Sequence, residues 1–315
     1  MLKCLAFSFL MAIAANMGLP SPSHGVSRNL VQVGLSDGPA ATPTPGASTT
    51  PAQTGVSCDG VSFTRTVKYG ADNLNVLDVA TAQTKPGVKR PVVVFIAGDS
   101  FKGDGNVATL RSLVEQAMCF AANNGLVAVN VSYRVAPAAT WPAGAKDVAA
   151  AISWVYENAD LFGGNAQEII PIGYGTGAFH LASFLAHKEF QEKDDFVAGA
   201  VLVSGIYRPT TDPGEGERAY FGTDPSTYDK RSAIPGLTAI EEPIVLAWSA
   251  VDSPQFIVQG EKLKDMLCGA GHCPRTAVLS KASSPVSVFD LDGASPDLHE
   301  RLRQLIGQID ARGLP

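Results

Sequence analysis

Basic residues are scarce in this chain of 315 residues, and nowhere do they form a run. Lysine and arginine together number 24 against 30 aspartate and glutamate residues, which gives a formal net charge of −6. Nucleic acids and anionic membrane surfaces attract proteins through concentrated positive charge. The composition therefore disfavours both as partners.

The N-terminus lacks an apolar run long enough to span a bilayer. A short run, Cys4 to Ile13, follows Lys3 and precedes small residues, which is typical of a secretory signal peptide. We therefore expect a signal peptide over residues 1–22 and a secreted or periplasmic protein with no transmembrane span. Residues 23–57 are rich in proline, threonine and alanine and have no apolar periodicity, which predicts a disordered tether. The remaining residues, 58–315, form the expected folded domain.

Cysteine is also sparse, with five in the chain and four beyond the signal peptide. Cys268 and Cys273 bracket a short loop, and export permits disulfides, so we predict a bridge between them. Cys119 lies in a helical run, where it is either a buried apolar residue or the partner of Cys58. One nearby histidine, His272, leaves too few ligands for a zinc site. No metal or cofactor is expected.

From Val61 onward, strand patterns alternate with helix patterns. Repeated βα units of this kind predict an α/β fold of three layers, in which helices cover both faces of a mainly parallel sheet. The expected strands are 61–69, 74–80, 91–97, 126–133, 168–173, 199–205, 243–249 and 286–291 ("VSVFDL"), and the expected helices are 107–123, 145–156, 176–187, 254–267 and one from Pro296.

A glycine-rich turn, "EIIPIGYGTGAF" (Glu168 to Phe179), joins a strand to a helix. It fits the dinucleotide-binding pattern G-x-G-x-x-G/A, but that loop normally follows the first strand and an acidic residue closes the next one. Here the turn follows about the fifth strand, and the next strand ends in Ser204 and Gly205. The alternative is the nucleophile elbow G-x-S-x-G, with Gly175 in the serine position. We favour the elbow.

A second stretch carries a resemblance to a known family. Within residues 132–165, the pattern is formed by Tyr133, Arg134, Ala136, Pro137, Pro142, Ala143, Trp154 and Phe162 to Asn165. This pattern resembles the segment before the elbow in the esterase/lipase branch of the α/β-hydrolases, especially the bacterial feruloyl-esterase and kynurenine-formamidase-like carboxylesterases. The resemblance implies an α/β-hydrolase fold and carboxylesterase-like chemistry.

The catalytic residues that the resemblance implies are mostly replaced. Gly175 has no side chain to act as nucleophile, and Thr176 beside it is a poor substitute because it begins the helix. The expected oxyanion loop of histidine and glycines reads instead Gly98 and Asp99. A carboxylate at Asp99 would oppose the negative charge that develops on a tetrahedral intermediate.

The acid and the base of the triad follow later in the chain. Asp252 matches the family position of the acid, although it would serve equally well as an N-cap for the helix that opens at Pro254. The expected position of the base, after "VSVFDL", holds Pro296. His299 lies one helical turn later, and we expect it on exposed helical surface.

A competing hydrolase pattern surrounds Ser100. Gly98, Asp99 and Ser100 match the nucleophile block of the SGNH ("GDSL") hydrolases, in which His299 would act as base. That family spaces its acid and base as D-x-x-H, whereas Asp297 and His299 give D-x-H. Its other oxyanion blocks are not recognisable either.

Three functions remain open at this point. The favoured one is an exported pseudohydrolase that binds a small apolar or ester-like ligand, or a protein partner, with Gly98, Asp99, Tyr174 and Gly175 at the binding site. The second is an active ester hydrolase that uses Ser100 or Thr176 as nucleophile. The third is a structural or interaction module whose pocket has filled.

Overall fold

The computed structural model describes residues 57–98, 100–105, 107–191 and 197–312. The signal peptide expected at 1–22, residues 23–56 of the expected tether, and Asp99 lie outside the described residues. Among the helices that are described, none combines the length and the apolar character needed to cross a membrane.

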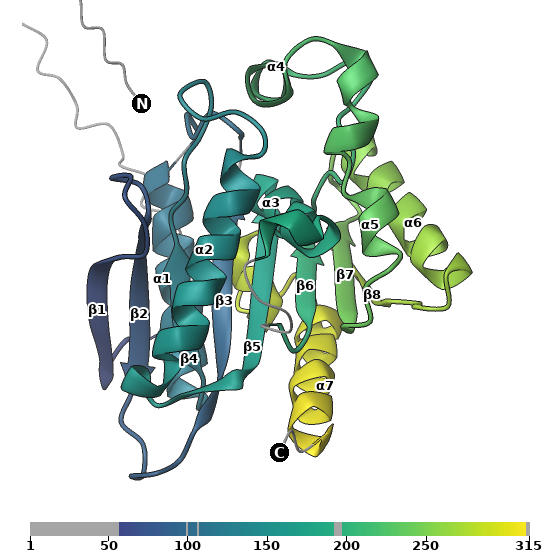
Figure 1. Ribbon diagram of the computed structural model, residues 1–315. Coiled ribbons are helices and arrows are strands. Elements are labelled where there is room, and N and C mark those ends of the chain that lie inside the picture. The colour runs from purple at the N-terminus through teal and green to yellow at the C-terminus, as the bar shows by residue number, and fades with distance from the viewer. Residues whose placement is uncertain (1–56, 99, 106, 192–196, 313–315) are drawn as a thin grey trace, which may run out of the picture. The chain divides into compact units, whose positions relative to one another are not determined.

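The centre of the fold is an eight-stranded sheet (Figure 1), in the order β1-β2-β4-β3-β5-β6-β7-β8. β1 and β2 pair antiparallel, as do β2 and β4, and every later pairing is parallel. This confirms the mainly parallel sheet and its antiparallel entry. The strands are β1 Val61–Lys68, β2 Val76–Ala82, β3 Arg90–Gly98, β4 Val127–Val131, β5 Gly164–Gly175, β6 Ala200–Val203, β7 Ile244–Ser249 and β8 Arg275–Leu279.

Helices cover both faces of the sheet. The α-helices are α1 Val107–Asn123, α2 Ala143–Asn158, α3 Thr176–Ala186, α4 Glu215–Phe221, α5 Ile234–Leu237, α6 Pro254–Gly269 and α7 Pro296–Arg312. The short 3-10 helices are η1 Ala159–Phe162, η2 Lys188–Phe190, η3 Pro225–Thr227, η4 Asp229–Arg231 and η5 Pro285–Phe289. Apolar side chains of α2, α3 and α6 form one core with the sheet, and those of α1 and α7 form the other.

Alternate residues of β3 enter these two cores. Val92, Val94 and Ile96 face α2 and α3, whereas Val93 and Phe95 face α1 and α7. A strand buried on both faces needs a continuous apolar run rather than an alternating one. The run "PVVVFIA" therefore places β3 at the middle of the sheet, beside β5.

One predicted strand is wrong. "VSVFDL" contains the 3-10 helix η5, and the last strand is instead β8, which the sequence analysis did not predict. The hydroxyl groups of Ser284 and Ser287 form a capping box at the start of η5, and Pro285 occupies its first turn. These residues favour a helical turn over an extended strand. The core buries every side chain of η5, which explains the apolar pattern.

Two disulfides are present in the domain. Cys268 pairs with Cys273, as predicted, and Cys58 pairs with Cys119, which ties the start of the domain to α1. The pairing of Cys119 resolves the alternative that its helical position left open.

Candidate functional site

The strand–elbow–helix predicted around Gly175 is confirmed. β5 ends at Gly175 and α3 begins at Thr176, so no residue separates the strand from the helix. Gly175 has φ 58° and ψ −125°, a conformation that residues with side chains rarely adopt. The tip therefore has the backbone of a nucleophile elbow and no side chain.

The neighbouring glycines allow close packing of the elbow. A Cβ atom on Gly177 would overlap the carbonyl oxygen of Ile96 in β3, and one on Gly173 would lie 2.6 Å from the Cα of Ala178. The glycine spacing thus lets α3 approach β3 and β5. The close approach of α3 to these strands accounts for the glycine spacing, which therefore does not require a bound dinucleotide.

The loop after β3 brings Gly98, Ser100 and Thr176 together. A Cβ atom on Gly98 would overlap the hydroxyl groups of Thr176 and Tyr133. The Thr176 hydroxyl donates to the Ser100 carbonyl oxygen over 3.4 Å, and the Ser100 hydroxyl donates to Asp104 over 2.7 Å. Neither hydroxyl has a histidine among its described hydrogen-bond partners. Asp99, which would complete this loop, is not among the described residues.

Asp252 lies beyond the carboxyl end of β7, where a triad acid belongs. Its Oδ2 atom accepts hydrogen bonds from the Ser249 N–H (2.8 Å) and from the Ser204 hydroxyl (2.6 Å). The N-cap of α6 is Ser253, and no side chain caps that helix, so the N-cap interpretation of Asp252 is wrong. Among the described residues, no histidine hydrogen-bonds to this carboxylate.

Ser204 was missed in the sequence analysis as a site residue. It follows β6, is nearly buried and has φ 48°, an unusual value for serine. Its only signal in the sequence is a polar residue directly after the apolar run of β6. Ser204 and Asp252 are 48 positions apart in the sequence, so their contact could not be predicted from it.

No histidine follows the last strand closely. The whole connection from β8 to α7, residues 280–295, contains no histidine. The Tyr174 hydroxyl donates to the Ser283 carbonyl in this loop over 2.9 Å. His299 lies on α7, half-buried rather than exposed, with its ring edge-on to Phe120 (6.0 Å) and Phe289 (6.2 Å). The structure therefore does not unite His299 with Ser100 or Asp252.

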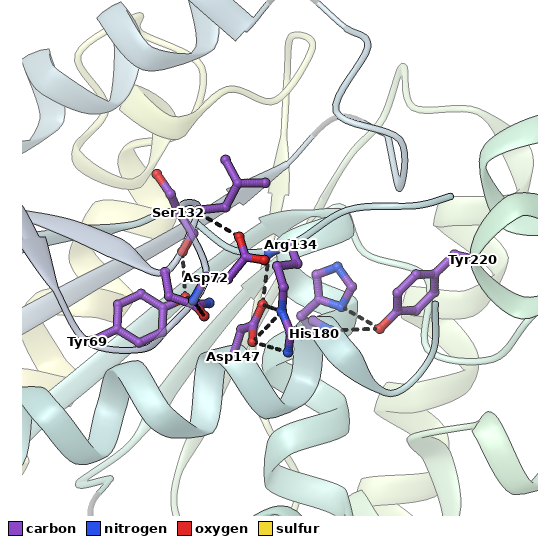
Figure 2. Close-up of polar contacts among 10 residues, drawn as sticks. Tyr69, Asp72, Ser132, Arg134, Asp147, His180 and Tyr220 are labelled. Carbon is purple, nitrogen blue, oxygen red and sulfur yellow. Dashed lines mark hydrogen bonds and ion pairs between the residues drawn. The ribbon is translucent and has the colours of Figure 1, made fainter. Parts of the chain in front are cut away.

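Beside the elbow, α3 carries a buried histidine that the sequence analysis did not single out. Burial lowers the pKa of His180 to about 3, so its imidazole is neutral at physiological pH. The ring packs against Phe101 and Tyr133, and its Nδ1 lies 3.4 Å from the hydroxyl of Tyr220 (Figure 2). Burial raises the pKa of Tyr220, which keeps that hydroxyl protonated. The pair links α3 to α4.

Aromatic side chains of α4 extend this contact. Tyr220 stacks on Phe101 at 4.9 Å and 12°, and Phe221 meets Phe179 edge-on at 4.9 Å. The main chain adds a bond from the Gly144 N–H to the Tyr220 oxygen. We call Phe101, Phe179, Tyr220 and Phe221 the aromatic cluster. It brings α4 against the loop that follows β3.

An ion pair fixes the segment that carries the family resemblance. Arg134 contacts both carboxylate oxygens of Asp147 through its guanidinium, at 2.7 to 3.1 Å, and its main-chain N–H donates to the same carboxylate (Figure 2). Asp147 is almost fully buried in α2, and its hydrogen bond raises the pKa of Arg134. The adjacent Tyr133 donates to the Ala97 carbonyl at the end of β3. The motif Tyr-Arg thus positions the loop beside the elbow.

Together, the sheet order, the central elbow and the acid after β7 define the α/β-hydrolase fold. The BD-FAE family model matches residues 77–203, and this match, together with the esterase relatives below, supports an α/β-hydrolase of the esterase/lipase family.

Curated relatives include two esterases of Mycobacterium tuberculosis. Esterase LipQ is 29% identical over 242 residues, which cover 73% of this chain and 56% of that protein. Esterase LipC is 32% identical over 155 residues, covering 45% of this chain and 36% of that protein. The matched segments thus span only about a third to a half of those relatives.

Solved esterase structures share the fold. Esterase B from Lactobacillus rhamnosis superimposes with a TM-score of 0.65 at 17% identity, covering 81% of this chain and 86% of that one. The hyperthermophilic esterase from the archaeon Pyrobaculum calidifontis gives a TM-score of 0.60 at 19% identity, covering 83% and 86%. At these identities the likeness shows the fold alone.

Proposed function

We propose that this protein is an exported, non-hydrolysing member of the esterase/lipase branch that binds a small apolar or ester-like ligand at the elbow. The observation that carries the proposal is Gly175, which has the strained backbone of a nucleophile elbow and no hydroxyl. Restoring an acyl-transfer site would require a nucleophile and a base together, because these groups act as a unit.

Two further observations support the absence of hydrolysis. The described loop after β8 offers no histidine, and its Ser283 carbonyl accepts a hydrogen bond from Tyr174. The carboxylate of Asp252, which would orient a histidine in a triad, is hydrogen-bonded to Ser204 and Ser249. The first observation concerns the base of the mechanism and the second concerns its acid.

The elbow retains features suited to binding. The first N–H groups of a helix lack partners within the helix and favour a carbonyl or anionic oxygen. With glycine at position 175, no side chain stands between a ligand oxygen and the N–H groups at the start of α3. The nearby aromatic cluster, which includes Phe101, is buried and gives the elbow an apolar surrounding.

Export is part of the same proposal. The N-terminal pattern of residues 1–22 supports a signal peptide, and disulfides persist mainly in oxidising compartments. The pairs Cys58–Cys119 and Cys268–Cys273 are consistent with such a compartment. Fractionation of cells that express the full chain should find it outside the cytoplasm, and a wholly cytoplasmic protein would contradict this part.

The central test combines activity and binding. The full chain should hydrolyse p-nitrophenyl butyrate at the background rate and resist a serine-directed fluorophosphonate probe. Short-chain esters should nevertheless raise its thermal unfolding midpoint, and Gly175→Ala, which adds a methyl group at the tip, should weaken that effect. Turnover that Ser100→Ala or Thr176→Ala abolishes would establish instead an active hydrolase with a relocated nucleophile.

A further inference from the structure

A cavity lies at the amino ends of the parallel strands, at the opposite end of the sheet from the elbow. It has a volume of about 320 Å³ and adjoins the amino ends of β7 and β8. Its walls come from the segment before β7, the end of α6 with the Cys268–Cys273 loop, and α7. The volume is at the lower end of the range for small-molecule sites.

The cavity is lined by charges of both signs. Glu241 and Glu242 lie on one wall, and Arg275 begins β8 on the other. None of the three forms an ion pair or a side-chain hydrogen bond with any residue in the described part of the chain. Arg275 pairs in register with Val245, three residues after Glu242, so the two main-chain positions are offset by about 10 Å along the strands. The opposite charges on the two walls form no ion pair with each other in the described part of the chain.

The floor of this cavity is apolar. Leu267 and Ile240 line it and are almost fully buried in the core. The adjoining disulfide closes the loop that supplies Gly271 and His272 to the rim. A ligand with a short aliphatic chain would thus lie over this apolar floor while its polar ends reach the charged walls.

We propose that this cavity binds a free basic amino acid such as lysine. The ligand carboxylate meets the guanidinium of Arg275, which suits carboxylate geometry. Its α-amino group meets Glu241, its terminal ammonium meets Glu242, and its methylene chain lies over the apolar floor of the cavity. Two carboxylates and one guanidinium give the walls a net charge of −1, which complements the net charge of +1 on lysine.

Calorimetric titration of the full, oxidised chain with L-lysine tests the proposal. L-norleucine is the matched ligand, because it keeps the carboxylate, the α-amino group and the chain but lacks the terminal ammonium. We expect lysine to bind at least about tenfold more tightly than norleucine. Equal affinities, no heat with lysine at millimolar concentration, or binding of a lysine-rich peptide but not of free lysine would overturn the proposal.

Three variants assign the contacts. Glu242→Gln should weaken lysine binding about tenfold and erode the preference for lysine over norleucine. Arg275→Gln should weaken the binding of lysine and of norleucine about equally, since both ligands carry a carboxylate. Glu261→Gln, on the exposed surface of α6, is the control and should bind lysine normally. Thermal unfolding verifies that each variant is folded, and lysine binding unchanged in both Glu242→Gln and Arg275→Gln would refute the site. These results are independent of the elbow.

Discussion

The Ser204 hydroxyl donates a 2.6 Å hydrogen bond to the carboxylate of Asp252, the one acid that matches the family triad. In a Ser-His-Asp triad the acid orients the histidine. Here its Oδ2 atom is engaged by Ser204 and by the main chain of Ser249. The acid thus joins the ends of β6 and β7.

This bond predicts a structural role for Asp252. Asp252→Ala would leave the nearly buried Ser204 hydroxyl without its acceptor, so the free energy of unfolding should fall by about 2 kcal/mol. Asp252→Asn keeps an acceptor oxygen and should lose less. Urea denaturation measures both, and the double variant with Ser204→Ala should lose less than the sum of the two single changes. An unchanged stability in Asp252→Ala would contradict the structural role.

A substitution at Gly177 should lower the free energy of unfolding more than Asp252→Ala does. In Gly177→Ala the new Cβ would overlap the Ile96 carbonyl oxygen, which belongs to the rigid backbone of β3. We expect a loss of more than about 3 kcal/mol or failure to fold. Gly307→Ala is the matched control, since its Cβ meets nothing within 4 Å in the middle of α7. That change should stabilise the protein by roughly 0.5–1 kcal/mol, and chemical denaturation compares the two.

The sequence was sufficient for the elbow and the centre of the sheet because both depend on local pattern. A continuous apolar run specifies β3, and glycines at every second position allow the close packing of α3 on β5. Residues that lie far apart in sequence were harder to place. The contact of Ser204 with Asp252, and that of His180 with Tyr220, arise only when separate elements meet.

Short elements were missed for a related reason. β8 is a five-residue strand at the edge of the sheet, where only Ala277 and Leu279 need to be buried. The fully buried η5 gave a stronger apolar pattern than this real strand. The seven residues of α4 are too few to establish a helical period, although they supply two members of the aromatic cluster.

His180 predicts a dependence of stability on pH. Its pKa is about 3 in the folded protein and near 6.5 when unfolded, so unfolding takes up a proton between these values. The contribution of the neutral, buried His180 to the free energy of unfolding is fully present above about pH 6.5. It is lost as the pH falls toward 3, at about 1.4 kcal/mol per pH unit.

His180→Asn retains an acceptor for Tyr220 but does not titrate. Between about pH 7 and pH 5, the unfolding free energy of the natural protein should therefore fall by about 2 kcal/mol more than that of the variant. His299→Asn, on the half-buried surface of α7, is the control for loss of a histidine. Parallel pH profiles for the natural protein and His180→Asn would contradict the buried, neutral state.

Gly175→Ser, finally, tests whether the missing hydroxyl is the only defect of the site. The substitution places a side chain at φ 58°, which should lower stability by roughly 1–3 kcal/mol. Gly175→Ala imposes the same strain without a hydroxyl and is the matched control. Hydrolysis of p-nitrophenyl butyrate by the two variants should differ by less than about tenfold. The reason is that the described loop after β8 supplies no histidine, and a restored nucleophile without its base gains little. A rate for Gly175→Ser about 100-fold or more above that of Gly175→Ala would show that the remaining site is still competent.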